Sequence, residues 1–237
     1  MSAPLVGFST GALARGEVAR GVGLAAAAAT PDSSTIELSA LHGSELNSVS
    51  AAARTPAVAR FARVSVHAPI KGPVPAAVEL TAQLAALGCD IVCHPDAMLA
   101  HSSGELQRFS ELGPALLVEN NDGRKDFGAS VEDLNEVFAA VPAARMCLDV
   151  SHALHAGGWD RLTELVARFG GRIAQLHVGC ACGEGVPLPL EEQLLEAVRY
   201  TLGELGELPV VIERSAETAT VGELRAAYAA VSSAAEL

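Results

Sequence analysis

The sequence has few basic residues. Lys and Arg occupy 16 of the 237 positions against 28 for Asp and Glu, so the formal net charge is −12. Affinity for nucleic acid comes largely from Lys and Arg that displace counterions condensed on phosphates. This deficit disfavours a general nucleic-acid-binding protein, and we expect no DNA or RNA partner. It leaves open a locally basic or metal-lined cleft that holds one phosphate group.

Long apolar runs and disulfide patterns are also missing. No stretch approaches the ~18 uninterrupted apolar residues of a membrane span, and the alanine run at 25–29 is too short. The start, Met1-Ser2-Ala3-Pro4, lacks the basic and apolar parts of a signal peptide. The five cysteines are odd in number and lack framework spacing. We therefore expect no membrane contact and a cytoplasmic location in a reducing compartment.

What the sequence does contain is an alternation of short apolar runs with helical segments. Half of the residues are hydrophobic, which excludes a disordered chain. Continuous apolar strands separated by helices are typical of a parallel sheet with both faces covered. The predicted helices include residues 75–87, 131–140, 159–169, 191–205 and 221–231. The predicted strands are residues 5–9, 35–38, 64–67, 91–94, 116–119, 146–149, 173–177 and 210–213.

The length fits one closed barrel, because eight strand–helix units of about 30 residues use nearly the whole chain. No Gly-x-Gly-x-x-Gly turn follows the first predicted strand, where the sequence reads Gly7-Phe8-Ser9-Thr10-Gly11, which argues against an open doubly wound sheet. No Pro-, Gly- or Ser-rich linker divides the chain. The sequence therefore predicts an α/β protein, a compact (β/α)8 TIM barrel that forms a single domain over residues 1–237.

Each of the last six predicted strands ends in an ionisable residue. In a barrel the C-terminal ends of the strands converge on one face, where active sites form. Burying so many carboxylates and imidazoles is costly unless they are paired or bind a metal. We therefore predict a divalent-metal site at this end of the barrel. The residues concerned are His67, His94, Glu119, Asp149, His177 and Glu213.

Ligand chemistry divides these residues into two sets. The first combines three carboxylates with one histidine and suits Mn²⁺, Co²⁺, Mg²⁺ or Zn²⁺. Its members are Glu119, Asp149, His177 and Glu213. His67 and His94 could complete a second site in which Glu119 bridges two ions about 3.5–4 Å apart. Alternatively, these two histidines bind substrate oxygens or serve only the structure of the barrel mouth. We expect one ion and leave the second open.

The order of these residues resembles one protein superfamily. The pattern His, His, Glu, Asp-x-x-His, His, Glu is similar to that of the xylose isomerase-like TIM barrels. The segment Cys147-Leu148-Asp149-Val150-Ser151-His152-Ala153-Leu154-His155-Ala156-Gly157 carries the resemblance most clearly. The superfamily includes endonuclease IV and the sugar phosphate isomerases and epimerases. The resemblance extends from Val6 to Ala216, although the same scaffold hosts unrelated chemistries.

Departures from the endonuclease IV pattern favour the isomerase branch. In that enzyme an Asp-x-His pair after the seventh strand, with the histidine of Asp-x-x-His, holds a third zinc. Here His152 is present, but residues 177–187 contain no Asp-x-His pair. The segment Gly183-Glu184-Gly185-Val186-Pro187 is instead similar to a Gly-rich turn of sugar isomerases and epimerases. The resemblance therefore implies an enzyme acting on a small sugar, sugar phosphate or hydroxy-ketone.

On this interpretation the enzyme moves a proton next to a carbonyl that the metal polarises. The resemblance implies that Glu119 and Glu213 flank the substrate as acid and base while each also binds the ion. His152 would hydrogen-bond a substrate hydroxyl or, alternatively, support Asp149.

A few further residues are candidates from their position alone. Glu37 contacts substrate or forms a structural ion pair, and Asn120 fixes a ligand or a loop. Arg214 binds an anionic group or pairs locally. Cys180 and Cys182 offer two thiolates suited to zinc, or are ordinary loop cysteines.

Two other functions stay open. One is a two-metal phosphoesterase similar to endonuclease IV, carried by His67, His94 and Glu119. The other is a multinuclear iron enzyme that uses O₂ on peptides, or a non-catalytic ligand-binding relative. One tightly bound ion per chain would favour the isomerase, two or three zinc ions the hydrolase, and iron with O₂ consumption the third. The sequence also leaves a homo-oligomer open.

Overall fold

The computed structural model describes residues 5–30, 34–40, 42–69, 75–99, 103–179, 191–213 and 219–236. Eight parallel strands pair in chain order, and the last pairs with the first, so the sheet closes into a barrel. The predicted (β/α)8 fold is therefore confirmed. The strands are β1 (Val6–Ser9), β2 (Ser34–Ser39), β3 (Arg63–His67), β4 (Asp90–Cys93), β5 (Leu116–Glu119), β6 (Arg145–Asp149), β7 (Ile173–Val178) and β8 (Val210–Ile212).

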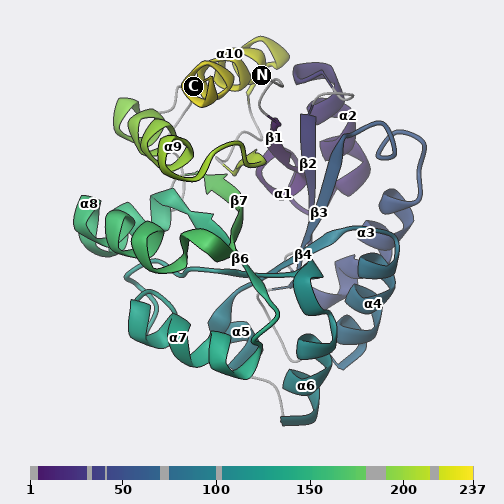
Figure 1. The fold of residues 1–237 in the computed structure, drawn as a ribbon. Coiled ribbons are helices and arrows are strands. Elements are labelled where there is room, and N and C mark those ends of the chain that lie inside the picture. Colours follow the sequence, from purple (N-terminus) through teal and green to yellow (C-terminus); the bar gives the residue numbers. More distant parts are fainter. Residues whose placement is uncertain are drawn as a thin grey trace.

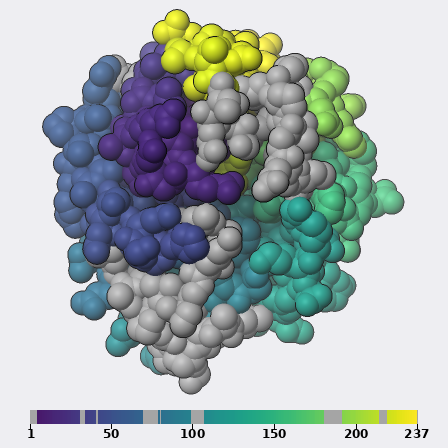
Figure 2. Space-filling model, turned by 180° about the vertical axis from the view of Figure 1, so that it is seen from behind, coloured from purple at the N-terminus to yellow at the C-terminus, as the bar shows by residue number. Residues whose placement is uncertain are grey.

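Helices surround the barrel (Figure 1). On the reverse side, α10 lies against the N-terminal elements (Figure 2), where it contacts α2 and β1. No described helix is long and apolar enough to cross a membrane. The helices are α1 (Thr10–Leu13), α2 (Val18–Ala28), α3 (Leu46–Ala53), α4 (Pro75–Ala86), α5 (Pro95–Leu99), α6 (Ser103–Glu111), α7 (Val131–Ala140), α8 (Val150–Phe169), α9 (Glu192–Leu205) and α10 (Val221–Ala235), with short 3-10 turns at Gly43–Glu45, Gly113–Ala115 and Gly170–Arg172.

The strand bounds agree with the predicted ones to within one residue, but α8 is longer than predicted. It begins directly after β6, because the side chain of Asp149 caps it by accepting from the backbone N–H of His152. Gly157 and Gly158 have non-helical backbone angles and kink the helix, with Gly158 at a φ of +66°. Because glycine is typical of helix ends, the two glycines interrupt the helical pattern of the sequence, and the predicted helix begins only at residue 159.

The hydrophobic core has two parts. Ile91 and Cys93 on β4 belong to the large cluster between the strands and the helices. Val92, between them, points the other way, into the barrel, because side chains alternate along a strand. There it packs with Leu117 and Cys147 in a small separate cluster that also includes Ala174. This apolar plug lies below the C-terminal end of the barrel, where the predicted site residues are.

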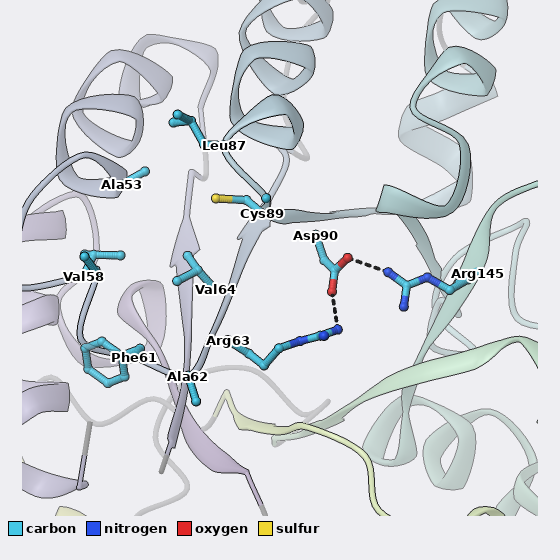
Figure 3. Close-up of a pocket in the computed structure, with 12 residues that line it drawn as sticks. Ala53, Val58, Phe61, Ala62, Arg63, Val64, Leu87, Cys89, Asp90 and Arg145 are labelled. Carbon is cyan, nitrogen blue, oxygen red and sulfur yellow. Dashed lines mark hydrogen bonds and ion pairs between the residues drawn. The ribbon is translucent and has the colours of Figure 1, made fainter. Parts of the chain in front are cut away.

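The N-terminal end of the barrel carries an ion-pair cluster instead (Figure 3). Asp90, the first residue of β4, accepts from Arg63 at 3.0 Å and also pairs with Arg145. A cavity of about 410 Å³ lies beside these three side chains and has an apolar wall that includes Phe61 and Leu87. In TIM barrels this end serves stability rather than chemistry.

Candidate metal centre

The six ionisable residues that the sequence singled out converge at the C-terminal end of the barrel. Their potential ligand atoms form two groups, and within each group these atoms lie within 4.8 Å of one another. One group contains Glu119, Asp149, His177 and Glu213, and the other contains His67, His94 and Glu119. The barrel therefore brings together both sets that ligand chemistry suggested.

Glu119 belongs to both groups, and its two oxygens face different partners. Oε2 lies 3.0 Å from His67 Nε2 and 3.4 Å from His94 Nε2. Oε1 lies 3.4 Å from His177 Nδ1 and 3.5 Å from His152 Nδ1. The side chain is 0% exposed. Both oxygens of Glu119 are therefore enclosed by imidazoles.

The rings of His67 and His94 are held by acceptors on their outer sides. His67 Nδ1 donates to the backbone oxygen of Ala68 at 2.9 Å, and His94 Nδ1 donates to Asn121 Oδ1. Nε2 is then the ring nitrogen of each that faces Glu119 Oε2, and it can bind an ion once it carries no hydrogen. Metal-binding histidines typically donate their other ring N–H to a carbonyl in this way.

The orientation of the Asn121 amide is itself fixed. Its Nδ2 donates to Asp96 Oδ1 and to the backbone oxygen of Phe127, both at 2.9 Å. Asp96 in turn accepts from Lys125 Nζ at 2.7 Å. The amide oxygen of Asn121 is therefore the atom left to face His94.

Asn120 supports Asp149 from the neighbouring strand. Its side chain accepts from the backbone N–H of Asp149 at 2.9 Å and donates to the backbone oxygen of Asp149 at 3.0 Å. Its own backbone oxygen accepts from His152 Nδ1 at 2.9 Å. Asn120 is fully buried and its amide is used by the backbone of Asp149. Asn120 therefore holds the backbone of Asp149 in place, and the prediction that it fixes a ligand stays a prediction.

The pKa values of the site show how closely its charges are coupled. Burial raises the pKa of Asp149 to about 6. Burial would also raise the pKa of Glu213, but the charge and hydrogen bond of His177 lower it to about 2. Burial would lower the pKa of His67, but the hydrogen bond to Glu119 and its charge raise it to about 10. Without an ion, a proton on His67 therefore balances the charge of Glu119, whereas burial lowers the pKa of His94.

A metal ion fits this donor set. Glu119 Oε1 and His177 Nδ1 are completely buried and have no hydrogen-bond partner among the described residues. Leaving such atoms unpaired inside a protein is costly. A divalent cation would satisfy both, and a mixture of carboxylate oxygens and imidazole nitrogens suits Mn²⁺, Co²⁺ or Zn²⁺.

The remaining predicted site residues lie outside the two ligand groups or outside the described residues. Glu37 is fully buried, and its side chain contacts Ser65, Gln175 and His177. These contacts give it a structural partner and no path to a substrate. Arg214, Cys180, Cys182 and the Gly-rich segment 183–187 lie outside the described residues.

Sequence reasoning missed two supporting residues, Asn121 and Gln175. Gln175 precedes His177 by two positions on β7, so it shares the inward face of that strand. This spacing was a signal that could have identified it. Asn121 had no comparable signal, because its role depends on how the loop after β5 folds back toward His94.

Comparisons with known proteins give the fold. No family model matches the chain, and no curated protein was found to match it. Among solved structures, D-psicose 3-epimerase from Clostridium cellulolyticum H10 has a TM-score of 0.61 at 13% identity, over 98% of this chain and 100% of that one. An AP endonuclease of family 2 from Brucella melitensis has a TM-score of 0.60 at 15% identity, over 93% and 96%.

A sugar phosphate isomerase/epimerase from Parabacteroides distasonis has a TM-score of 0.55 at 13% identity, over 100% of this chain and 95% of that one. The similarity extends over nearly the whole of each chain, and it spans proteins named for different reactions. It therefore identifies the architecture and does not select a reaction. The chain has the fold of the xylose isomerase-like TIM barrels.

Proposed function

We propose that this protein is a divalent-metal-dependent hydrolase that cleaves a phosphate ester of a small molecule, with Glu119 placed to serve as a ligand at both of two ion sites. The observation that carries the proposal is the placement of the two Glu119 oxygens. One faces His67 and His94, and the other faces His177. Two ions that share a carboxylate are a recurrent arrangement for phosphoester chemistry.

In this proposal some residues of the site bind the ions and others transfer protons. His67 and His94 would hold one ion with Glu119, and Asp149, His177 and Glu213 would hold the other with the same carboxylate. When bound, two such ions would polarise the phosphate and make a water molecule acidic enough to supply a nucleophile near neutral pH. The proposal thus uses all six residues predicted at the strand ends.

Glu213 and His152 are the residues best placed to act on the substrate. The side chain of Glu213 is 21% exposed, and its Oε2 faces His177, so its Oε1 can accept a proton from the attacking water. Burial would lower the pKa of His152, but Asp149 and Glu119 raise it. A protonated His152 can donate from Nε2 to an anionic substrate oxygen while Nδ1 stays bonded to Asn120.

The acidic composition supports a small substrate over a nucleic acid. The net charge of −12 repels a phosphodiester backbone, and electrostatic attraction supplies much of the affinity in nucleic-acid binding. A single phosphate group held by two cations does not need a basic surface around it.

A sugar isomerase or epimerase is the second candidate. The observation that favours it is that Oε2 of Glu213 and Oε1 of Glu119 lie on the same nitrogen of His177, at 3.2 Å and 3.4 Å. A single ion at this position would have a carboxylate on either side, as proton transfer next to a carbonyl requires. The enclosure of Glu119 Oε2 by His67 and His94 weakens this candidate, because that oxygen is the one such a reaction would need.

Metal stoichiometry together with product analysis separates the two candidates. We would strip the protein with a chelator, reload it with Mn²⁺, Co²⁺ or Zn²⁺ and measure ions per chain. Hydrolysis would be followed with p-nitrophenyl phosphate, and isomerisation by deuterium uptake from solvent into a panel of ketoses. Two ions with phosphate release support the hydrolase, and one ion with deuterium uptake would establish the second candidate instead. Glu196→Gln, an exposed change on α9, is the matched control.

A further inference from the structure

A buried carboxylate that the proposed reaction does not use lies directly behind His177. Glu37 is on β2, and its Oε2 lies 3.0 Å from His177 Nε2. The other ring nitrogen, Nδ1, faces Glu119 Oε1 and Glu213 Oε2. We propose that Glu37 is a positioning residue that accepts the Nε2–H of His177 and so directs the Nδ1 lone pair into the metal centre. This inference rests on the proposed metal-dependent function.

The surroundings of Glu37 require it to be an acceptor. Besides His177, its Oε2 receives hydrogen bonds from Ser65 Oγ and Gln175 Nε2, both at 3.2 Å. Ser65 is the registered neighbour of Glu37 on β3, and Gln175 is on β7, across the barrel. Oε2 thus accepts from two donors on β3 and β7, and a hydrogen on His177 Nε2, 3.0 Å away, completes the set.

Gln175 offers His177 a competing partner. Its Nε2 lies 2.9 Å from His177 Nε2, so the amide could donate to that nitrogen if the ring carried its hydrogen on Nδ1. That tautomer would turn an N–H toward the metal centre and block it for an ion. Glu37 Oε2 accepts from His177 Nε2 in the first tautomer, and the Gln175 amide can then donate to the same carboxyl oxygen instead. The carboxylate therefore decides which ring nitrogen is left free.

An amide at position 37 would remove this control. Glu37 Oε1 is buried and has no hydrogen-bond partner among the described residues. In a Glu37→Gln variant, an amide that keeps its oxygen toward His177 would bury an unpaired NH₂ group in place of Oε1. The opposite orientation would point the NH₂ group at His177 Nε2 and favour the blocking tautomer. Both orientations weaken ion binding at His177.

The effect is expected at only one of the two ion sites. His67 and His94 are oriented by the Ala68 backbone and by Asn121, and neither depends on Glu37 for its outer hydrogen bond. Changing the outer partner of a metal-binding histidine typically costs 10–100-fold in affinity. Glu37→Gln should therefore weaken one site by about 10–100-fold and leave the other close to wild type.

The test combines zinc affinity with the tautomer of His177. Zinc binding would be measured by competition with a chromophoric chelator, and the ring nitrogens by ¹⁵N NMR of histidine-labelled protein. Wild type should bind two zinc ions and show His177 with its hydrogen on Nε2. Glu37→Gln should weaken one site by about 10–100-fold, Glu37→Asp should recover part of that affinity, and Glu196→Gln, an exposed change on α9, should bind as wild type does.

The outcomes distinguish this inference from the function on which it rests. Wild-type protein that binds none of Zn²⁺, Mn²⁺ and Co²⁺ would overturn the proposed function. Wild-type protein with two zinc ions, and a Glu37→Gln variant with the same affinities and tautomer, would overturn the positioning role alone. If Glu37→Gln does not fold, a hydrogen on Nδ1 of His177 in zinc-loaded wild type would still refute it, and a hydrogen on Nε2 would support it.

Discussion

Asp149 accepts a hydrogen bond from the backbone N–H of His152 at 2.8 Å, so a residue of the candidate metal centre is also the N-cap of α8. The capping bond uses Oδ1 and leaves Oδ2 for an ion. It also sets the distance between the Asp149 carboxylate and the imidazole of His152, whose Nδ1 lies 3.6 Å from Oδ2. The spacing Asp-x-x-His is therefore a local structure as well as a ligand pattern.

The two roles of Asp149 can be separated by substitution. Asn is as good an N-cap as Asp, whereas Ala loses the cap at a cost of about 0.5–2 kcal/mol. We expect Asp149→Asn to bind metal much more weakly, yet to be at least as stable as wild type in EDTA above pH 6, because burial raises the Asp149 pKa to about 6 and makes its ionised form costly there. Asp149→Ala should lose both metal affinity and stability.

Chelator titration and denaturant unfolding in EDTA would measure these two effects. Ser130→Ala is the control for a lost cap, since Ser130 caps α7 away from the metal centre. It should lower stability without changing metal affinity. Equal metal binding by Asp149→Asn and wild type would exclude Asp149 as a ligand.

The sequence predicts the barrel well because its strands are fully buried and therefore almost uniformly apolar. The alternation with helices then specifies a closed parallel sheet, whose strand ends bring His67 and Glu213 to the same face without any knowledge of loops. The supporting contacts were harder to predict. Asn121 contacts His94 only because its loop folds back toward that residue. Glu37 was expected at the open end of the barrel, but its side chain is completely buried.

The contacts of individual side-chain atoms could not be predicted from the sequence. A strand pattern tells which residues point inward, but not which of two oxygens faces which histidine. The enclosed position of Glu119 is of this kind, and it is the reason why we propose a two-ion hydrolase ahead of a single-ion isomerase. The cytoplasmic location and the homo-oligomer stay predictions.

Removing a ligand of one site should halve the metal content. In His94→Ala the pair His67 and Glu119 is left with too few ligands, whereas the four residues around His177 are unchanged. We expect one tightly bound ion per chain in this variant, against two in wild type, and loss of phosphoesterase activity. Elemental analysis after gel filtration measures this directly. A second ion retained by His94→Ala at wild-type affinity would place the second site elsewhere.

The stability of the ion-free protein should depend on pH through His67. Burial would lower the pKa of this residue, but the hydrogen bond to Glu119 and its charge raise it from 6.5 to about 10. A folded-state pKa above the unfolded one means that the stabilisation is fully present below pH 6.5 and is lost as the pH rises through 10. In EDTA, Tm should therefore fall over this range, and it should fall less in His67→Ala.

The same protonation predicts proton release when metal binds. At neutral pH His67 carries a proton that an ion must displace, so zinc affinity should rise with pH and zinc uptake should acidify a weakly buffered solution. A pH indicator dye would follow this release. Zinc binding that is independent of pH between 6.5 and 10 would contradict a role for His67 as a ligand.

Turnover should depend on Glu213 more than metal binding does. Its Oε1 is the oxygen assigned to the proton of the attacking water, and the side chain is 21% exposed, so a water molecule can approach it. Glu213→Gln retains an oxygen that can face an ion but has no basic oxygen. We expect it to keep part of its metal affinity and lose kcat by about 10²–10⁴-fold, the usual contribution of a general base. Measuring kcat at metal saturation, with Glu196→Gln as the control, separates loss of the base from loss of the ion. A saturated Glu213→Gln enzyme with wild-type kcat would show that another group takes the proton.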